Sequence, residues 1–403
     1  MPNTYSKSTS IFKILNKYEP RSMQGQLPIV WEKAKDSFVW DIDGNKYIDF
    51  TSGICVANAG HNNPRIVKAI RDAELYHSYT FPTAIKAKYL KELCNTTGFE
   101  KAFLLSAGTE ATECAVKLMR LYTGKKGIIS FIGSMHGRTS LAERLKGENS
   151  SWATRDHYVY HLPFPPERTF VESLRIYSEY PNILFDGFAG VIIETYQGWS
   201  ARFFEKQYIQ DLVKYCKEQN ILVCFDEIQS GFGRTGKMFG YEHYDIPQPD
   251  LICVGKGMTS SVPMSGVLGR ADILDNPAVG DMSSTHSANP LCCTAGLANL
   301  REIRRILPTL EQKEHILWDF LQRFVCFMPE VNGKGLVAAI ITKDTLFAEK
   351  VCLEALNKGL LLLKTGKPSI KIAPPLTIDI DTLSQGLHIL FECIQKVIND
   401  TKP

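Results

Sequence analysis

Short apolar segments alternate with longer helical segments through the middle of the chain, and this alternation limits the possible fold more than any other feature. The apolar runs that could form strands lie at 101–106, 127–131, 190–194, 221–226, 251–254 and 262–268. The stretches 109–122 and 204–219 between them have the pattern of helices. Strands that alternate with helices indicate βαβ units, and near-continuous apolar strands indicate a sheet covered on both faces. The middle of the chain therefore predicts an α/β unit.

The two ends of the chain have a different pattern. The segment W-D-I-D-G-N-K-Y at 40–47 predicts a hairpin with an Asp-Gly turn. In the C-terminal part, the pattern predicts helices at 312–327, 348–358 and 381–398 and a strand at 369–372. We expect residues 1–55 and 308–403 to form a small α+β domain beside a large domain of residues 56–307.

Composition and charge exclude several classes of protein. Hydrophobic residues make up 44% and charged residues 22% of 403 residues, which excludes intrinsic disorder. Lys and Arg number 46 against 43 Asp and Glu, and a net charge of +3 predicts no nucleic-acid-binding or anionic-membrane surface. The apolar runs at 335–342 and 359–363 fall short of the ~18 residues that span a bilayer. The N-terminus lacks the apolar core of a secretory signal.

The eleven cysteines carry no repeated spacing and no C-x-x-C pair. Scattered thiols in apolar segments are typical of buried free cysteines in a reducing compartment, so we expect a cytoplasmic protein. The histidines show no metal-ligand spacing, and we expect no metal site.

The residues that carry chemistry follow the predicted strands, where ligands bind in open α/β sheets. The small residues Ser106-Ala107-Gly108-Thr109 enter a helix, and a helix N-terminus suits a phosphate. Asp226 ends one strand, and Lys256 follows another between two glycines. Pyridoxal phosphate needs such an amine, a carboxylate that keeps the ring nitrogen protonated, and a phosphate anchor.

A series of longer motifs makes this prediction specific. They are W-D-I-D-G-N-K-Y-I-D-F (40–50), S-G-I (52–54), G-H-N-N-P (60–64), S-A-G-T-E-A (106–111), M-H-G-R-T (135–139), F-D-E-I-Q-S-G-F-G-R-T-G (225–236), P-D-L (249–251), G-K-G (255–257) and S-T-H-S-A-N-P-L (284–291). Over residues 25–400 the chain resembles the class III pyridoxal-phosphate-dependent aminotransferases, the relatives of ornithine, acetylornithine and 4-aminobutyrate aminotransferases. The resemblance implies fold type I: a large domain with a mostly parallel seven-stranded sheet flanked by helices, and a small α+β domain. It also implies a homodimer with shared active sites.

The resemblance also assigns roles by position. Lys256 would form the Schiff base with the cofactor, and Asp226 would pair with its pyridine nitrogen. The cofactor-binding residues would be Ser106, Gly108, Thr109, Met135, His136, Glu194, Gln229 and Thr285, with Gly108 and Thr109 on the phosphate, Gln229 near the O3′ oxygen and Thr285 contributed by the partner subunit. The substrate-binding residues would be Arg138, which suits a carboxylate, Trp199 and Lys371.

Three positions depart from the family pattern. Met135 stands where the family has a Phe or Tyr that stacks on the cofactor ring, although a thioether can also pack on an aromatic face. Trp199 stands where relatives that act on ornithine have a glutamate that masks an arginine, and Lys371 stands at the position of that arginine. A lysine can pair with a carboxylate, but it lacks the planar fork. The departures leave the reaction type intact and leave the substrate open.

We therefore expect an aminotransferase that moves an amino group from a small-molecule donor to a carbonyl acceptor by a ping-pong mechanism. Glutamate is a candidate donor, and a biosynthetic transfer of the ω type is the first choice. An amino sugar or aminoglycoside is an alternative substrate. A pyridoxal-phosphate racemase, mutase or decarboxylase on the same fold would keep Lys256 and Asp226 but form no lasting pyridoxamine phosphate. A non-catalytic dimer that binds the cofactor is the third alternative.

Overall fold

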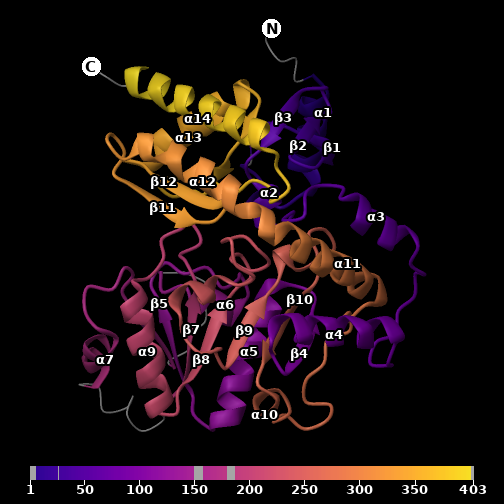
Figure 1. Cartoon of the computed structure of the whole chain (residues 1–403), viewed down its shortest axis with the longest axis vertical. Helices are drawn as coiled ribbons and strands as arrows, with labels where there is room; N and C mark the ends of the chain where they lie inside the picture. Colours follow the sequence, from indigo (N-terminus) through magenta and orange to yellow (C-terminus); the bar gives the residue numbers. More distant parts are fainter. Residues whose placement is uncertain (1–5, 26, 149–157, 179–186, 401–403) are drawn as a thin grey trace.

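A seven-stranded sheet is the largest sheet of the protein, whose computed structural model describes residues 6–25, 27–148, 158–178 and 187–400 (Figure 1). Its strands are β4 (Lys101–Leu105), β5 (Gly127–Phe131), β6 (Val159–Leu162), β7 (Phe188–Glu194), β8 (Leu222–Asp226), β9 (Leu251–Val254) and β10 (Ser265–Gly269). They lie in the order β4-β10-β9-β8-β7-β5-β6, and β10 is antiparallel to both of its neighbours. The other neighbouring strands pair in parallel. The mostly parallel sheet that the sequence predicts is confirmed.

Helices cover both faces of this sheet, as the apolar strands require. On one face, α5 (Gly108–Thr123) packs its buried side chains in one apolar cluster with residues of the strands, among them Ile192. On the other face, α9 (Lys206–Glu218) lies in a second cluster, which contains Ile193. The other α-helices described in this part are α3 (Pro64–Arg71), α4 (Ala84–Thr97), α6 (Ser140–Arg144), α7 (Phe170–Ser178), α10 (Ala271–Leu274) and α11 (Pro290–Ile306). Because successive residues of β7 point to opposite faces, one strand contributes to both clusters.

The end regions of the chain form two four-stranded sheets, one of which combines strands from both ends. The strands are β1 (Trp31–Lys35), β2 (Phe38–Asp41), β3 (Lys46–Asp49), β11 (Glu330–Lys334), β12 (Val337–Ile341), β13 (Leu360–Leu361), β14 (Leu363–Lys364) and β15 (Ser369–Ile372). The hairpin predicted at 40–47 is confirmed by the antiparallel pairing of β2 and β3. Because β3 also pairs in parallel with β13, the N-terminal strands and the C-terminal segment share one sheet, with order β1-β2-β3-β13. The domain limits at residues 55 and 308 stay a prediction.

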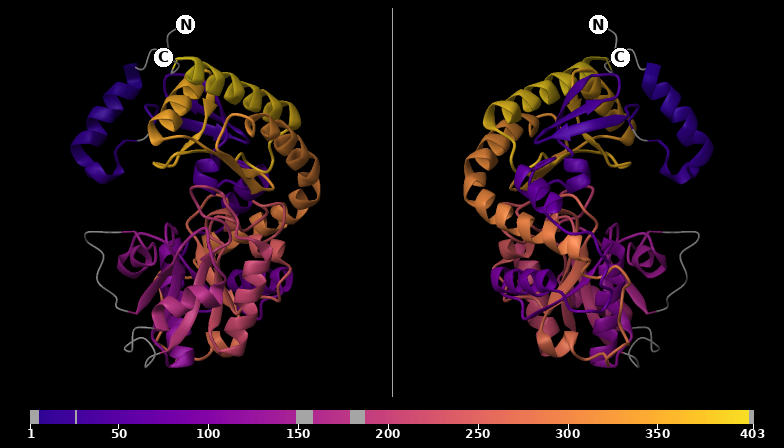
Figure 2. Two further views of the ribbon diagram at one scale, coloured as in Figure 1. Left: turned by 90° about the vertical axis from the view of Figure 1, so that its left-hand side faces the viewer. Right: turned by 90° about the vertical axis from the view of Figure 1, so that its right-hand side faces the viewer.

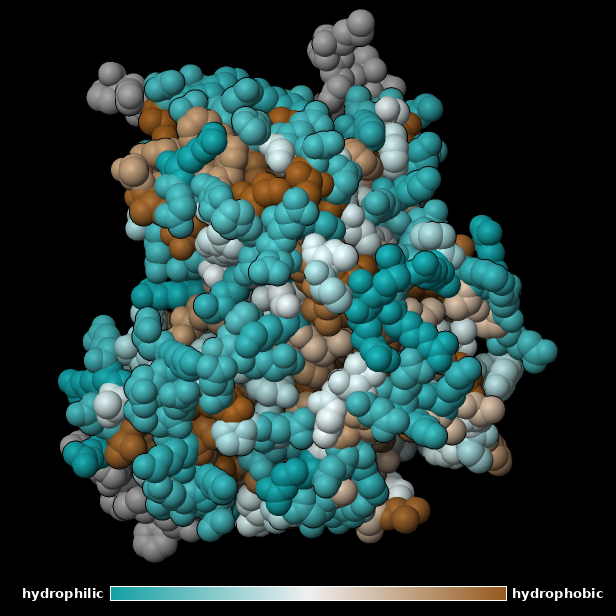
Figure 3. All heavy atoms as spheres, in the orientation of Figure 1, coloured by the Kyte–Doolittle hydropathy of each residue, from teal (hydrophilic) through white to brown (hydrophobic). Residues whose placement is uncertain are grey.

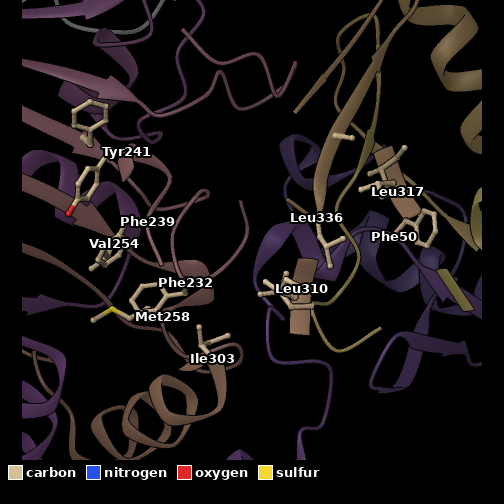
Figure 4. Close-up of a cluster of buried hydrophobic side chains, with 14 of the residues drawn as sticks. Phe50, Phe232, Phe239, Tyr241, Val254, Met258, Ile303, Leu310, Leu317 and Leu336 are labelled. Atoms are coloured by element: carbon tan, nitrogen blue, oxygen red, sulfur yellow. The ribbon is translucent and has the colours of Figure 1, made fainter. Parts of the chain in front are cut away.

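The helices of the terminal regions are α1 (Ser6–Tyr18), α2 (Ser52–Cys55), α12 (Leu310–Leu321), α13 (Thr345–Asn357) and α14 (Ile380–Asp400). Figure 2 shows α1 standing away from the rest of the molecule, next to the N-terminal strands. A single apolar cluster extends from the large sheet to the terminal sheets. It includes Phe232 and Met258 on one side and Leu310 and Phe50 on the other (Figure 4).

Two predicted elements differ from the structure, and one helix was not predicted. The helix expected at 312–327 ends at Leu321, and a 3-10 turn continues from Gln322 to Phe324. The strand expected at 262–268 begins only at Ser265, after Pro263, which has no backbone N–H for a sheet. The helix α1 in the N-terminal segment was not predicted from the sequence.

The surface in the view of Figure 3 is mainly polar, with scattered apolar patches. In the described part of the chain, no helix combines the length and the apolar character that crossing a bilayer requires. All eleven cysteines are free thiols, and most of them are buried. The described residues contain no group of three or more His, Cys, Asp or Glu side chains suited to a metal ion.

Candidate active site

Three neighbouring parallel strands end at the same edge of the sheet and place three predicted residues there. Glu194 is the last residue of β7, and Asp226, the last residue of β8, pairs with it in register. Asp226 in turn pairs with Cys253, so β9 ends beside β8 and leads into Lys256. The βαβ topology therefore brings together residues that lie far apart in the sequence.

Asp226 is held by two hydrogen bonds in a buried position. Its Oδ2 lies 2.8 Å from Nδ1 of His136, and its Oδ1 accepts a hydrogen bond from the N–H of Ile228 at 3.0 Å. The carbonyl of His136 accepts a hydrogen bond from Thr112 of α5 at 2.8 Å. Nε2 of the same imidazole is buried and has no hydrogen-bond partner among the described residues. The pair of His136 and Asp226 thus has a fixed orientation and one unused polar atom.

Lys256 has a backbone conformation that is unfavourable for a residue with a side chain. Its φ of +40° lies in the left-handed region, and such strain is concentrated at functional sites. It stands between Gly255 and Gly257, and a Cβ on Gly257 would lie 2.4 Å from Nδ2 of Asn58. Within the described residues, its amine has neither a hydrogen-bond nor an ion-pair partner. The amine is therefore available for chemistry.

The N-terminus of α5 presents free donors. Oε2 of Glu110 accepts hydrogen bonds from the N–H groups of Ser106 at 2.8 Å and Ala107 at 3.2 Å. The next two N–H groups, those of Gly108 and Thr109, have no partner in the described part of the chain. Because these groups point out of a helix N-terminus, they could hold a phosphate.

A loop closes over this helix end through Gly137. Its φ is +145°, and a Cβ at this position would lie 2.3 Å from Oγ1 of Thr109. Oγ1 of Thr109 also lies 2.6 Å from Oγ1 of Thr139. Only glycine allows this close approach, so the loop residues 135–139 remain next to the start of α5.

Glu194 connects this loop with the segment that follows β7. Its Oε2 accepts a hydrogen bond from the N–H of Met135 at 3.0 Å, while the Met135 side chain is 40% exposed. Burial raises the pKa of Glu194 to about 7; His136 opposes this shift and Asp226 adds to it. Glu194 is thus a buried carboxyl group that can be protonated near neutral pH.

Lys371 is completely buried on β15. Its Nζ donates to the carbonyl of Gly198 and to Oε1 of Gln229, and it lies 5.2 Å from the ring centroid of Tyr196. Burial lowers the pKa of Lys371 to about 8, and the charge of Lys256 adds to this shift. The structure thus brings Lys371 and Gln229 together, and a carboxylate would reach this amine only after Gln229 moved. Its role in substrate binding stays a prediction.

The three other predicted residues lie nearer the surface. Trp199 is half-buried, and its carbonyl accepts a hydrogen bond from Ser369 at 2.9 Å. Arg138 is exposed, with no ion pair to a described residue. Thr285 is exposed, and its carbonyl lies 2.8 Å from Nε2 of His77. Among the described residues, no hydrogen bond joins Thr285 to Asp226 or to the N-terminus of α5, although Thr285 and Glu110 line the same cavity.

Sequence reasoning missed the role of Arg234, although it stands in the F-G-R-T-G segment. Its guanidinium is fully buried and donates to the carbonyls of Leu336 at 3.0 Å and Pro374 at 2.6 Å. It also donates to Oδ1 of Asn58 at 2.7 Å and to Oγ of Ser52 at 3.2 Å. Arg234 thus joins the loop after β8 to both ends of the chain. The position of Arg234 inside the motif F-D-E-I-Q-S-G-F-G-R-T-G was the signal in the sequence that could have identified it.

The model of the family described as aminotransferase class-III matches residues 20–394. The chain is 32% identical to a 2-aminoadipate transaminase from Pseudomonas putida, over 92% of this chain and 96% of the relative. It is 33% identical to a probable 4-aminobutyrate aminotransferase from Bacillus subtilis (89% and 91%) and 32% identical to an acetylornithine aminotransferase from Methanocaldococcus jannaschii (92% and 96%).

Solved structures show the same fold. The ornithine aminotransferase from Toxoplasma gondii superposes with a TM-score of 0.86 at 24% identity, over 98% of this chain and 96% of that one. An S-selective transaminase from Bacillus megaterium gives a TM-score of 0.88 at 23% identity, over 98% and 99% of the two chains.

Proposed function

The chain belongs to the class-III aminotransferases, and we propose that its natural reaction is a biosynthetic transamination of the ω type, with glutamate as a candidate donor. It is an enzyme of the transaminase class that uses pyridoxal phosphate, an amino donor and a carbonyl acceptor. The natural donor and acceptor, the roles of individual residues, the homodimer and the cytoplasmic location belong to the proposal.

The residues at the strand ends fit pyridoxal phosphate. This cofactor supplies a carbonyl that accepts the amino group and a ring that withdraws electrons. The N–H groups of Gly108 and Thr109 would hold its phosphate, and Asp226, oriented by His136, would hold the proton on its ring nitrogen. Ser106, Met135, Glu194 and Gln229 complete the cofactor-binding set that we propose.

One observation carries the proposed chemistry: Lys256, just after β9, has an amine with no partner among the described residues, and it lies beside the carboxylate that ends β8. We infer that this amine binds the cofactor carbonyl and, when released, moves the proton at the substrate carbon next to nitrogen. The left-handed backbone conformation of Lys256, with a φ of +40°, supports a functional role for this position.

The relatives support a substrate that carries a carboxylate. 2-Aminoadipate, 4-aminobutyrate and acetylornithine, the compounds in their names, are all amines with at least one carboxylate. The exposed guanidinium of Arg138 suits a carboxylate, and Trp199 would form a wall of the pocket. Lys371 would supply a second, deeper cation once Gln229 moved away from its amine. 4-Aminobutyrate carries its amine at the end of the molecule remote from the carboxylate, and this relative favours the ω-type transfer that we propose.

An apolar exposed loop supports the homodimer. Leu75 is 84% and Phe81 is 74% exposed, and Tyr76 and Tyr79 lie between them. His77 of this loop contacts the carbonyl of Thr285. A cavity of about 870 Å³ runs along α5 to the same region and includes Thr285 in its lining. Four large exposed apolar side chains in one short loop are typical of an interface. We propose that Thr285 reaches the phosphate site of a second copy there.

A half-reaction of the holoenzyme tests the proposal. Glutamate should convert the bound cofactor to pyridoxamine phosphate, which loses the visible absorbance, and a carbonyl acceptor should restore it. Lys256→Ala should lose at least about 10³-fold in this conversion and retain cofactor through its phosphate, whereas the exposed Lys217→Ala should behave as the wild type. Turnover in Lys256→Ala would refute the site, and racemisation without loss of absorbance would refute transamination.

A further inference from the structure

The backbone around Lys256 is strained at two positions and is held by other parts of the chain. Residues 256–260, which we call the lysine loop, include two left-handed residues that carry a side chain: Lys256 with a φ of +40° and Ser260 with a φ of +56°. Such conformations persist only where the surrounding contacts impose them. The contacts that hold this loop therefore determine where the Lys256 amine lies.

Asn299 of α11 makes three hydrogen bonds to the lysine loop. Its Nδ2 donates to the carbonyls of Gly257 at 2.8 Å and Met258 at 2.9 Å, the two residues directly after Lys256. Its Oδ1 accepts a hydrogen bond from Oγ of Ser260 at 2.6 Å. Because both carbonyls can only accept, the orientation of the amide is fixed. Asn299 is fully buried, so water does not compete for these groups, and one side chain binds the loop near both of its ends.

Two further contacts connect the lysine loop with its surroundings. Oγ of Ser260 accepts a hydrogen bond from the N–H of Ala59 at 3.0 Å, in the segment between α2 and α3. The Met258 side chain packs in the same apolar cluster as Ile303, which follows Asn299 by four residues on α11 (Figure 4). Residues four apart lie on the same face of a helix. One face of α11 therefore supports the loop with both a polar and an apolar side chain.

We propose that Asn299 is a positioning residue for Lys256, because it holds the lysine loop in its strained conformation and thereby fixes where the amine meets the cofactor. The inference rests on the proposed role of Lys256 and extends it to a buried side chain of another element. Without the two donated hydrogen bonds, the loop can relax toward unstrained backbone conformations, and the amine moves with it. A displacement of about 1 Å can lower a reaction rate by up to about 100-fold. Proton transfer depends on the amine more strongly than substrate binding does, so kcat should fall while KM stays nearly the same.

Two variants and one control separate this role from a general loss of stability. Asn299→Leu keeps the approximate size of the side chain and removes both donors. Ser260→Ala is the milder change, because it removes only the hydroxyl group from the same network. The control Tyr47→Phe removes a buried hydrogen bond in the terminal strands, from the Tyr47 hydroxyl to Oδ2 of Asp41 at 2.8 Å. It should lower stability without moving Lys256.

The first experiment needs no turnover. Pyridoxal phosphate is added to the cofactor-free protein, and the visible absorbance that develops as its carbonyl condenses with the Lys256 amine, with loss of water, is followed in time. The rate should fall roughly tenfold in Asn299→Leu and roughly threefold in Ser260→Ala, and it should stay at the wild-type value in Tyr47→Phe. Calorimetry with inorganic phosphate should give the same Kd for all of these proteins, because the N-terminus of α5 is not altered.

The second experiment is the half-reaction of the holoenzyme with glutamate. Asn299→Leu should lower kcat roughly tenfold and leave KM within about twofold of the wild-type value. Deuterium at C2 of glutamate should slow this variant more strongly than the wild type, because proton transfer becomes slow relative to the other steps. The Tyr47→Phe control should show the wild-type isotope effect.

Cofactor bonding at the wild-type rate in both Asn299→Leu and Ser260→Ala would overturn the inference, and so would an equal loss of rate in Tyr47→Phe or a loss of phosphate affinity that accompanies the loss of rate. If the wild type does not convert glutamate, the proposed donor fails, and the rate of cofactor bonding still decides the role of Asn299. Bonding at the wild-type rate in Lys256→Ala would instead refute the proposed role of Lys256.

Discussion

At the scale of single residues, Glu194 couples the charge of the site to the stability of the fold. Its folded-state pKa of about 7 lies above the ordinary value of 4.5, so between these pH values the folded chain binds more protons than the unfolded chain. The free energy of unfolding then decreases as pH rises through this window. In the wild type this carboxyl group should lower the free energy of unfolding by about 2 kcal/mol between pH 5 and pH 7, and Glu194→Gln should abolish this decrease, measured by urea unfolding of the cofactor-free protein at the two pH values.

The exposed Glu205→Gln is the control for this prediction and should leave the pH dependence as it is in the wild type. If the curves for Glu194→Gln and wild type run parallel from pH 5 to pH 7, Glu194 does not titrate in that window, and the assignment is wrong.

The sequence predicts some residue environments and not others. Asp226 and Lys256 could be placed because each follows an apolar run, and parallel strands end at one edge of a sheet. The burial of Lys371 could not, because it depends on the pairing of β15 with β12 and on the carbonyl of Gly198. Neither contact leaves a local signal in the sequence.

At the scale of elements, the N-terminus of α5 depends on Glu110. Its carboxylate accepts hydrogen bonds from the N–H groups of Ser106 and Ala107 and interacts favourably with the helix dipole. Glu110→Ala leaves both donors without this partner and should lower the free energy of unfolding by about 1 kcal/mol. Thermal unfolding of the cofactor-free protein measures this, and Glu110→Gln, which keeps an acceptor oxygen, should lose less. Equal stability of Glu110→Ala and wild type would show that the cap contributes nothing.

Elements with a strong pattern are the ones that the sequence predicts well. The strands of the large sheet are nearly continuous apolar runs, because both of their faces are covered. The helix α1 was missed although Ile11, Ile14, Leu15 and Tyr18 have helical spacing. In the structure Ile14 is 57% and Tyr18 is 74% exposed, so this stripe does not pack into the core of the same chain.

At the scale of the whole molecule, the loop with Leu75 and Phe81 tests the proposed homodimer. Leu75→Asp together with Phe81→Asp places two charges in an apolar contact, where their desolvation is costly, and should convert the dimer to a monomer. Analytical ultracentrifugation measures this, and activity should fall as the monomer forms because Thr285 would no longer reach a second site. The control Val325→Asp changes another exposed apolar residue, 56% exposed, and should leave the mass unchanged. A wild-type monomer would refute the shared site.

The connection between the large sheet and the chain ends depends on Arg234. This buried guanidinium has no carboxylate partner among the described residues and instead donates to four neutral oxygens, including the carbonyls of Leu336 and Pro374. Arg234→Met removes the cost of burying the charge but leaves these acceptors without their donor, and charge-assisted bonds of this kind outweigh that gain. We expect the free energy of unfolding to fall on the order of 3 kcal/mol, measured by urea unfolding. Arg301→Met, which breaks a half-exposed pair with Glu92, should cost under about 1 kcal/mol. Equal losses in the two variants would mean that burial adds nothing to the contribution of Arg234.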